Sequence, residues 1–267
     1  MPALTFTLKA PPPERLDLSP LVPERLNGLD AARIERITIG TSRLALTVAD
    51  LFTLAGDDPS ELRFEGGSER FDQVGANLAS GHIHIDGDVG QRCGLDMTGG
   101  TIEVRGSAGP FAGAGATEGR IVIHGDAGEK AGGAVHGGRY GLAGATLVIH
   151  GNAGPRAGDR MRRGMLLVGG SAGDHAGSRM IAGTILARRV GAEPGLGMRR
   201  GTIAVGAHGT LTPTFMPSGS GDLIFMRLLR SAVAKHHADL AAMLSNDPFR
   251  FVGDQAALGK GEILVCG

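Results

Sequence analysis

The residues best suited to bind a ligand lie in one stretch of the chain, where arginine is concentrated. Residues 156–200 hold nine arginines against three acidic residues, a net charge of +6 in a chain whose formal net charge is zero. Guanidinium groups pair well with carboxylates and phosphates. Two uses remain open: salt bridges to another subunit, or contacts with an anionic partner or a polyanionic cofactor tail. Arg160, Arg162 and Arg163 are the candidate contacts.

Other groupings that could support catalysis or metal binding are weak. His124 and His150 each precede a glycine and could stack on one another, but a metal would need a third ligand beside them. His236 and His237 are expected on the surface of a C-terminal helix. We find no Ser/His/acid arrangement and no paired carboxylates on one strand face. We therefore predict no catalytic residues, no metal and no cofactor bound by this chain.

The two cysteines and the glycines give no ligand site either. Cys93 and Cys266 are far apart and in no metal-binding spacing, and Cys93 is most simply a small buried residue. No Gly-Lys-Ser/Thr sequence follows any glycine cluster, which disfavours a nucleotide site. Only two of the five glycine-rich turns carry an aspartate after their first glycine, too few for a calcium-binding repeat.

The glycines instead mark a structural repeat. The pattern Gly-x-x-Gly-x-x-x-Gly occurs five times, with first glycines at Gly87, Gly106, Gly125, Gly151 and Gly170. The spacings are 19, 19, 26 and 19 residues, so one copy has a seven-residue insertion. That insertion includes residues 137–141, with the only tyrosine of the chain, and we expect it to form a contact loop. A fixed period near 20 residues is typical of a solenoid.

Each repeat begins with a short alternating run such as Thr101-Ile102-Glu103-Val104, which predicts a strand whose inward pair is Ile102 and Val104. Small residues such as Ala108 and Ala112 take the inward positions after the glycine. We therefore predict a mainly β fold, a right-handed parallel β-helix with a repeat of about 19 residues. Residues 62–206 would form this solenoid.

The flanks are expected to cover its two ends. Residues 1–61 would be an N-terminal cap, with a strand at 4–8 and a short helix starting near residue 48. Residues 207–267 would form a C-terminal helix and tail that pack on the solenoid. Helical spacing of apolar residues predicts that helix over 222–244, sealing the last coils, and residues 262–265 would add one more strand.

Composition narrows the function further. Zero net charge argues against a nucleic-acid partner, and no apolar run approaches the roughly 18 residues of a membrane span. No signal peptide is evident at the start, so we expect a cytoplasmic protein. One tyrosine and no tryptophan disfavour an independent β-helix enzyme acting on polysaccharide. A hexapeptide-type acyltransferase is also disfavoured, because aliphatic residues occupy one side of each coil only.

The repeat and the tail together resemble a known family. The tail runs Asp247-Pro-Phe-Arg-Phe-Val-Gly-Asp254 and continues through Gly259-Lys-Gly-Glu-Ile-Leu-Val265. Over residues 45–265 the chain resembles the C subunit of formylmethanofuran dehydrogenase and of the bacterial formyltransferase/hydrolase complex. It is more distantly similar to the C-terminal β-helix domain of the large subunit of glutamate synthase.

The resemblance implies a noncatalytic structural subunit in one-carbon metabolism. In the bacterial setting, which we favour, a formyl group passes from formyl-tetrahydromethanopterin to a methanofuran-type carrier, and formate is released. The alternative is a molybdenum or tungsten formylmethanofuran dehydrogenase of methanogenesis. Implied partners are formyltransferase, amidohydrolase-like and molybdopterin-enzyme-like subunits, which would hold the metals and catalytic residues. The carrier's glutamyl tail would give the arginines an anionic neighbour, although no family motif assigns them to it.

Overall fold

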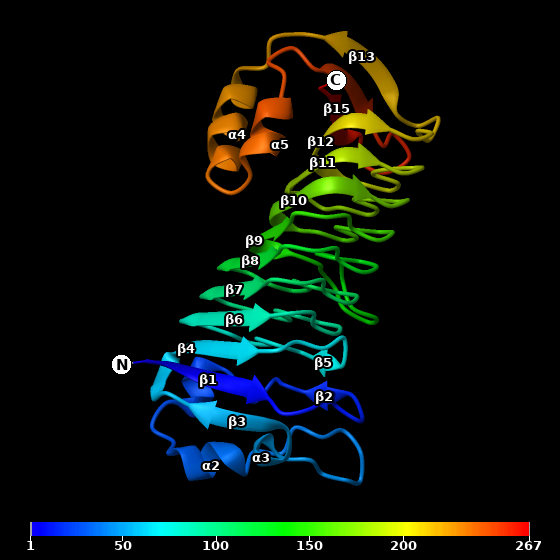
Figure 1. Ribbon diagram of the computed structural model, residues 1–267. Helices are drawn as coiled ribbons and strands as arrows, with labels where there is room; N and C mark the ends of the chain where they lie inside the picture. Colours follow the sequence, from blue (N-terminus) through cyan, green and yellow to red (C-terminus); the bar gives the residue numbers. More distant parts are fainter. Residues whose placement is uncertain (1, 267) are drawn as a thin grey trace.

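The computed structural model describes residues 2–266, and one large sheet dominates it (Figure 1). The sheet has 13 strands in the order β13-β14-β15-β12-β11-β10-β9-β8-β7-β6-β4-β1-β3. All neighbouring strands between β1 and β15 in this order are parallel, from the β1–β4 pair to the β12–β15 pair. The antiparallel pairs lie at the two ends of the sheet: β1 with β3, and β13 with β14 and β14 with β15. The sheet is open, with β13 and β3 as its edge strands. The predicted mainly β fold is confirmed at this level.

One strand comes from each repeat, in register with its neighbours. The central strands are β4 (Asp58–Glu65), β6 (His82–Asp86), β7 (Thr101–Val104), β8 (Arg120–Ile123), β9 (Ala143–Ile149), β10 (Arg163–Ala172), β11 (Thr184–Val190) and β12 (Arg200–His208). Ile102 pairs with Ile83 and with Ile121, and all three are buried. The predicted inward pair, Ile102 and Val104, is therefore confirmed.

A second, narrower ladder runs along the same stack. Single parallel bridges join Ser68 to Val89 and then connect Ala108, Ala127, Ala153 and Ala172 in order along successive coils. The inward alanines are buried, so methyl groups fill this side of the coils from Ala108 to Ala172. A small parallel sheet, β2 (Leu16–Asp17) with β5 (Phe71–Asp72), lies near the N-terminal end of the stack.

The repeated glycines serve two different steric needs. A Cβ on Gly109 would lie 2.7 Å from the carbonyl carbon of Gly90 in the preceding coil, so the second glycine of the phrase permits close approach of backbones. Gly158, the third glycine of its phrase, has φ +72°, and a Cβ there would lie 2.6 Å from Cδ1 of Ile185. Glycine meets both needs at this position, because it adopts a positive φ readily and has no Cβ to collide with Ile185.

Left-handed backbone also occurs at residues that are not glycine, which the sequence did not predict. One row of such residues follows the coils at Gln73, Arg92, Phe111, Lys130, Arg156, His175 and Glu193. A second includes Asn77, Asp96, Arg160 and Arg179, with Gly115 and Gly197 at equivalent points. Left-handed backbone costs an L-residue roughly 1–2 kcal/mol. Three of the nine arginines, at positions 156, 160 and 179, therefore lie in turns whose left-handed conformation is imposed by packing between the coils.

The N-terminal segment lies at one end of the stack (Figure 1). It contains β1 (Ala3–Leu8), α1 (Pro23–Leu26), α2 (Ala31–Glu35), α3 (Val48–Leu51) and β3 (Phe52–Ala55). Strand β1 pairs with β4 and so continues the sheet. The ring of Phe6 stacks on that of Phe64 with centroids 4.8 Å apart and meets Phe52 edge-on at 5.9 Å. Aromatic packing thus joins this segment to the first coil.

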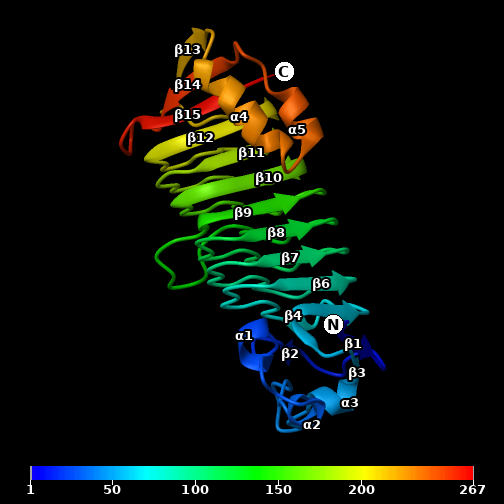
Figure 2. The same cartoon turned by 90° about the vertical axis from the view of Figure 1, so that its left-hand side faces the viewer.

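The C-terminal segment differs from the predicted single helix over 222–244. Two helices form, α4 (Ile224–Ala234) and α5 (Ala238–Met243), separated by a turn at residues 235–237. They do not seal the end of the stack but lie on the outer face of the sheet, in front of its last strands in Figure 2. The end is formed by β13 (Met216–Ser220), β14 (Phe249–Gly253) and β15 (Lys260–Val265). The predicted extra strand at 262–265 is confirmed within β15.

The helices lie there because of one column of outward side chains. In the N-terminal strands this column is polar, with Arg63, His84 and Glu103 in register. From β8 onward it is apolar: Val122, Val148, Leu167, Leu186, Ala204 and Leu264. Met226, Val233 and Leu240 of the two helices bury these residues in a second core. Burial of apolar surface thus decides which half of the outer face is covered.

Candidate anion-binding groove

The clearest candidate site is a groove among arginine side chains at the turns of the last coils. Its lining residues are Arg139, Arg160, Arg179, Ile181, Gly197 and Arg199, around a cavity of about 270 Å³. We call this set the arginine groove. Of the predicted contacts it includes Arg160, whereas Arg162 and Arg163 are not in its lining.

The seven-residue insertion contributes to this groove. The loop leaves the stack between β8 and β9 and is visible beside β9 in Figure 2. Arg160 Nη1 donates a hydrogen bond of 3.1 Å to the carbonyl oxygen of Gly138. The ring of Tyr140 lies 4.7 Å from Cζ of Arg162 and 5.3 Å from Cζ of Arg139. The contact of Arg162 with Tyr140 and the hydrogen bond of Arg160 hold the loop against the coils, so the insertion and the arginine-rich stretch form one surface.

One acidic residue lies behind the groove, where it contacts Arg179 of the lining. Asp159 is buried, with its side chain only 3% exposed. Arg179 Nη2 donates to both carboxylate oxygens, at 2.8 and 2.9 Å, and the Ser178 hydroxyl donates at 2.7 Å. This bidentate pair orients Arg179 and neutralises it. Within residues 2–266, no acidic side chain forms an ion pair with Arg139, Arg160 or Arg199.

A second cavity adjoins the groove and shares Arg179 and Gly197 with it. It has a volume of about 410 Å³ and extends to Arg156, His175 and Asp254. Asp254 is buried and accepts a hydrogen bond of 2.9 Å from the backbone N–H of Gly197. Its carboxylate is therefore occupied in attaching the C-terminal loop to the coils.

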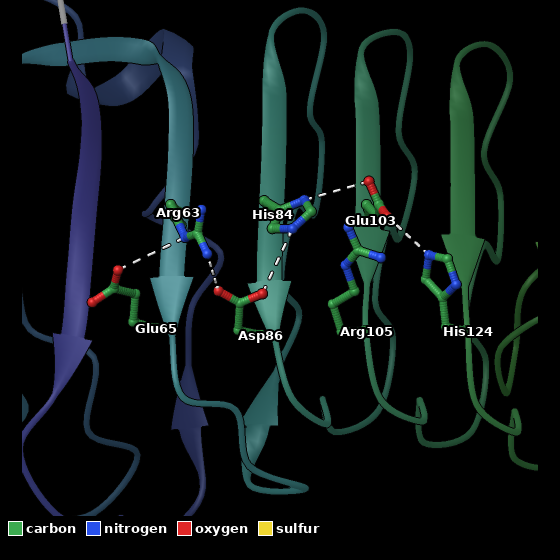
Figure 3. Close-up of polar contacts among 7 residues, drawn as sticks. All are labelled: Arg63, Glu65, His84, Asp86, Glu103, Arg105 and His124. Carbon is green, nitrogen blue, oxygen red and sulfur yellow. Dashed lines mark hydrogen bonds and ion pairs between the residues drawn. The ribbon is translucent and has the colours of Figure 1, made fainter.

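The uncovered outer face carries a different charge pattern, a ladder across β4, β6, β7 and β8 (Figure 3). Arg63 pairs with Asp86 at 2.6 Å, and His84 lies between Asp86 and Glu103, at 3.6 and 3.4 Å. Nε2 of His124 hydrogen-bonds to Glu103 at 2.8 Å. Burial alone would raise the pKa of Glu103, but the hydrogen bond from His124 and nearby positive charge hold it below its usual value. These acids and bases satisfy one another, so the ladder has less unpaired charge for a ligand than the arginine groove.

Three histidines lie where this ladder meets the helices. The rings of His124 and His150 stack at 5.0 Å as the sequence suggested, and His237 packs on His150 at 5.0 Å. The expectation that His237 is a surface residue is wrong, because it is buried between α5 and the sheet. Nδ1 of His237 accepts the backbone N–H of Leu240 at 3.4 Å and caps α5. Burial, more than any other cause, lowers the pKa of both His150 and His237.

Metal and thiol chemistry find little support in the part of the chain that is described. No group of three or more His, Cys, Asp or Glu side chains in residues 2–266 is arranged to hold a metal ion. Cys93 is buried in the coil as predicted, and burial raises the pKa of its thiol to about 12. A thiol so rarely ionised is a poor nucleophile.

None of the helices in residues 2–266 has the length and apolarity of a membrane-spanning segment.

No protein-family model matches the chain, but comparison with characterised proteins is informative. The C subunit of the formyltransferase/hydrolase complex Fhc of Methylorubrum extorquens strain AM1 is 53% identical over 262 residues, which cover 98% of each chain. The chain belongs to the family of Fhc C subunits.

A solved structure agrees with membership of this family. A chain in the crystal structure of the formyltransferase/hydrolase complex (FhcABCD) from Methylorubrum extorquens, in complex with methylofuran, is 52% identical to this one. The two superpose with a TM-score of 0.94, and the match covers 98% of both. The fold of this family therefore extends over the N-terminal segment, the stack and the C-terminal helices alike.

Only part of the arginine groove could be predicted from the sequence. Arg160 was expected from its place in the charged stretch, whereas nothing connected that residue with Arg139, which lies outside the stretch. Arg179 and Arg199 were included in the charge count without a specific role. The seven-residue insertion was the sequence feature that could have predicted this contact. A loop inserted one coil before the basic turns has to pack against them.

Proposed function

We propose that this chain is the C subunit of a formyltransferase/hydrolase complex, a noncatalytic structural subunit on which sister subunits assemble. The observation that carries the proposal is 53% identity to the Fhc C subunit over nearly the whole of both chains. The TM-score of 0.94 to a chain of the methylofuran-bound FhcABCD complex supports it. The bacterial hydrolase setting is favoured over a molybdenum or tungsten formylmethanofuran dehydrogenase for the same reason.

The finer parts of the proposal follow from the resemblance. The complex would transfer formyl from formyl-tetrahydromethanopterin to a methanofuran-type carrier and release formate, in the cytoplasm. The formyltransferase, amidohydrolase-like and molybdopterin-enzyme-like subunits would supply the catalytic groups, and this chain would bind no cofactor of its own. A relation to the C subunit of formylmethanofuran dehydrogenase is part of this proposal.

The architecture suits a supporting role. We interpret the stack at residues 62–206 as a right-handed parallel β-helix, with residues 1–61 as its N-terminal cap and 207–267 as the segment packed on it. The parallel strands and the alanine bridges support this interpretation. Arg162 and Arg163, which are exposed, and the partly exposed Arg160 would contact a sister subunit or the carrier's anionic tail.

Complementation tests the proposal directly. A Methylorubrum extorquens strain lacking its own C subunit would be given this chain with an affinity tag. We expect the A, B and D components to co-purify with the tag and formyl transfer to be restored, because 53% identity preserves most of an interface. A folded chain that recovers neither the components nor the activity contradicts membership of the complex. Turnover by the isolated full chain contradicts the noncatalytic role.

A further inference from the structure

Four arginine side chains line one small cavity, and within residues 2–266 only Arg179 among them forms an ion pair with an acidic side chain. We infer that the arginine groove, lined by Arg139, Arg160, Arg179 and Arg199, binds a ligand that carries at least two carboxylates. The inference rests on the proposed function, in which Arg160 contacts a sister subunit or an anionic tail, and it names the chemistry of the ligand at that contact. The groove is formed by this chain alone, so binding there can be measured without the other subunits.

The repeat places the arginines in two parallel rows. Backbone bonds from Arg160 N to Ser178 O and from Arg179 N to Leu196 O put Arg160, Arg179 and Gly197 at equivalent points of successive coils. Bonds from Ile181 N to Met161 O and from Arg199 N to Met180 O define the neighbouring row. Successive coils lie about 4.8 Å apart, the spacing of hydrogen-bonded strands. Guanidinium groups at this spacing can reach two carboxylates of one small molecule.

Space for the ligand comes from a missing side chain. Gly197 occupies the point where the two preceding coils carry arginine, and a Cβ there would already lie 3.4 Å from Cγ of Arg179. Ile181 forms an apolar patch between the rows. Arg139 reaches the cavity from the insertion loop. The result is a pocket of about 270 Å³, suited to a small dicarboxylate or the end of a carboxylate-bearing chain and too small for a folded domain.

The chain itself shows which anion the groove prefers. Arg179 already holds the carboxylate of Asp159 with three hydrogen bonds, from Nε and Nη2, and a guanidinium group offers any carboxylate this planar set of donors. Phosphate sites typically add free backbone N–H groups. The N–H of Gly197, the glycine of this groove, is already donated to Asp254. Carboxylate is therefore favoured over phosphate.

Calorimetric titration of the full chain at low ionic strength tests the site. The probes are glutarate, a peptide of four glutamates and inorganic phosphate. The double variant Arg160→Gln/Arg199→Gln removes two charges from the groove and leaves Arg179 in place to pair with buried Asp159. Arg36→Gln/Arg43→Gln is the control, because it removes the same charge from the N-terminal segment.

We expect glutarate or the peptide to bind with one site per chain. The groove variant should weaken that binding about tenfold or more, and the control variant should leave it unchanged. Binding of glutarate indicates a free dicarboxylate as the ligand, and binding of the peptide alone indicates carboxylates on a chain. The inference is overturned by equal loss in both variants, by phosphate binding as tightly as the carboxylates, or by no binding of either carboxylate probe. Unchanged thermal unfolding of both variants shows that the fold is retained.

Discussion

Replacing Gly109 with alanine should separate two coils of the stack. A Cβ at this position would lie 2.7 Å from the carbonyl carbon of Gly90 and 2.9 Å from the nitrogen of Gln91, both backbone atoms that cannot rotate away. Ordinary contact begins at 3.4 Å, so the coils would have to part locally by about 0.7 Å. The N–H of Gly109 donates to the carbonyl oxygens of Val89 and Gly90 at 3.0 Å, and such a shift would lengthen both bonds beyond useful range.

The free-energy cost follows from these contacts. An overpacked interior typically costs about 1–3 kcal/mol, and an unsatisfied buried donor about 1–3 kcal/mol. Part of the strain is relieved as the bonds lengthen, so we expect Gly109→Ala to lower the free energy of unfolding by about 2–4 kcal/mol. Far-UV circular dichroism during heating would register this as a lower midpoint.

Two other glycines provide matched controls. A Cβ on Gly221 would meet no other atom within 4 Å, and its φ is not left-handed, so Gly221→Ala should be neutral or slightly stabilising. Gly137 is equally open but has φ +77°, so Gly137→Ala measures only the cost of placing an L-residue in left-handed backbone, about 1 kcal/mol. The steric reasoning is refuted if Gly109→Ala unfolds at the same temperature as Gly221→Ala.

Two further predictions concern the layer of helices on the sheet. The pKa of both His150 and His237 is lowered, chiefly by burial. The stability that depends on their neutral form is therefore fully present above about pH 6.5, the pKa of histidine in an unfolded chain, and is lost as the pH falls below it. His237→Asn, which can still accept the N–H of Leu240, should lose less stability between pH 7.5 and 5.5 in thermal melts; equal losses would contradict this. Leu186→Ala should lower the free energy of unfolding by about 2–5 kcal/mol in denaturant titrations, because Leu186 is buried in the second core. The same substitution at exposed Leu44 should change it by no more than about 0.5 kcal/mol. Similar values for the two variants would show that the second core contributes little to stability.

Much of the stack was predictable because its signals are local. Alternation such as Ile102 and Val104 marks a strand with one inward face, and the 19-residue spacing places equivalent residues on neighbouring coils. The strands at residues 4–8 and 262–265 were recognised for the same reason. The break between α4 and α5 was not, since helical spacing of apolar residues continues across the turn that ends at His237.

The position of these helices was present in the sequence but not recognised. The outward column changes from Glu103 to Val122 at β8 and remains apolar to Leu264. A run of apolar residues on the outside of a sheet requires a covering layer. Because the strands of successive repeats lie in register, this run places the covering layer on the face of the sheet.

The sequence by itself determined the strand that recurs in each repeat, its inward aliphatic side and the excess of positive charge toward the C-terminal end of the stack. Each depends on residue type at a regular interval. Only the tertiary structure decided that Arg139 joins Arg160, Arg179 and Arg199 around one cavity. The direction in which a turn residue points depends on its backbone conformation, and Arg160 and Arg179 adopt a left-handed φ that their residue type does not predict. The stack imposes that conformation because its hydrogen bonds between coils outweigh the local cost.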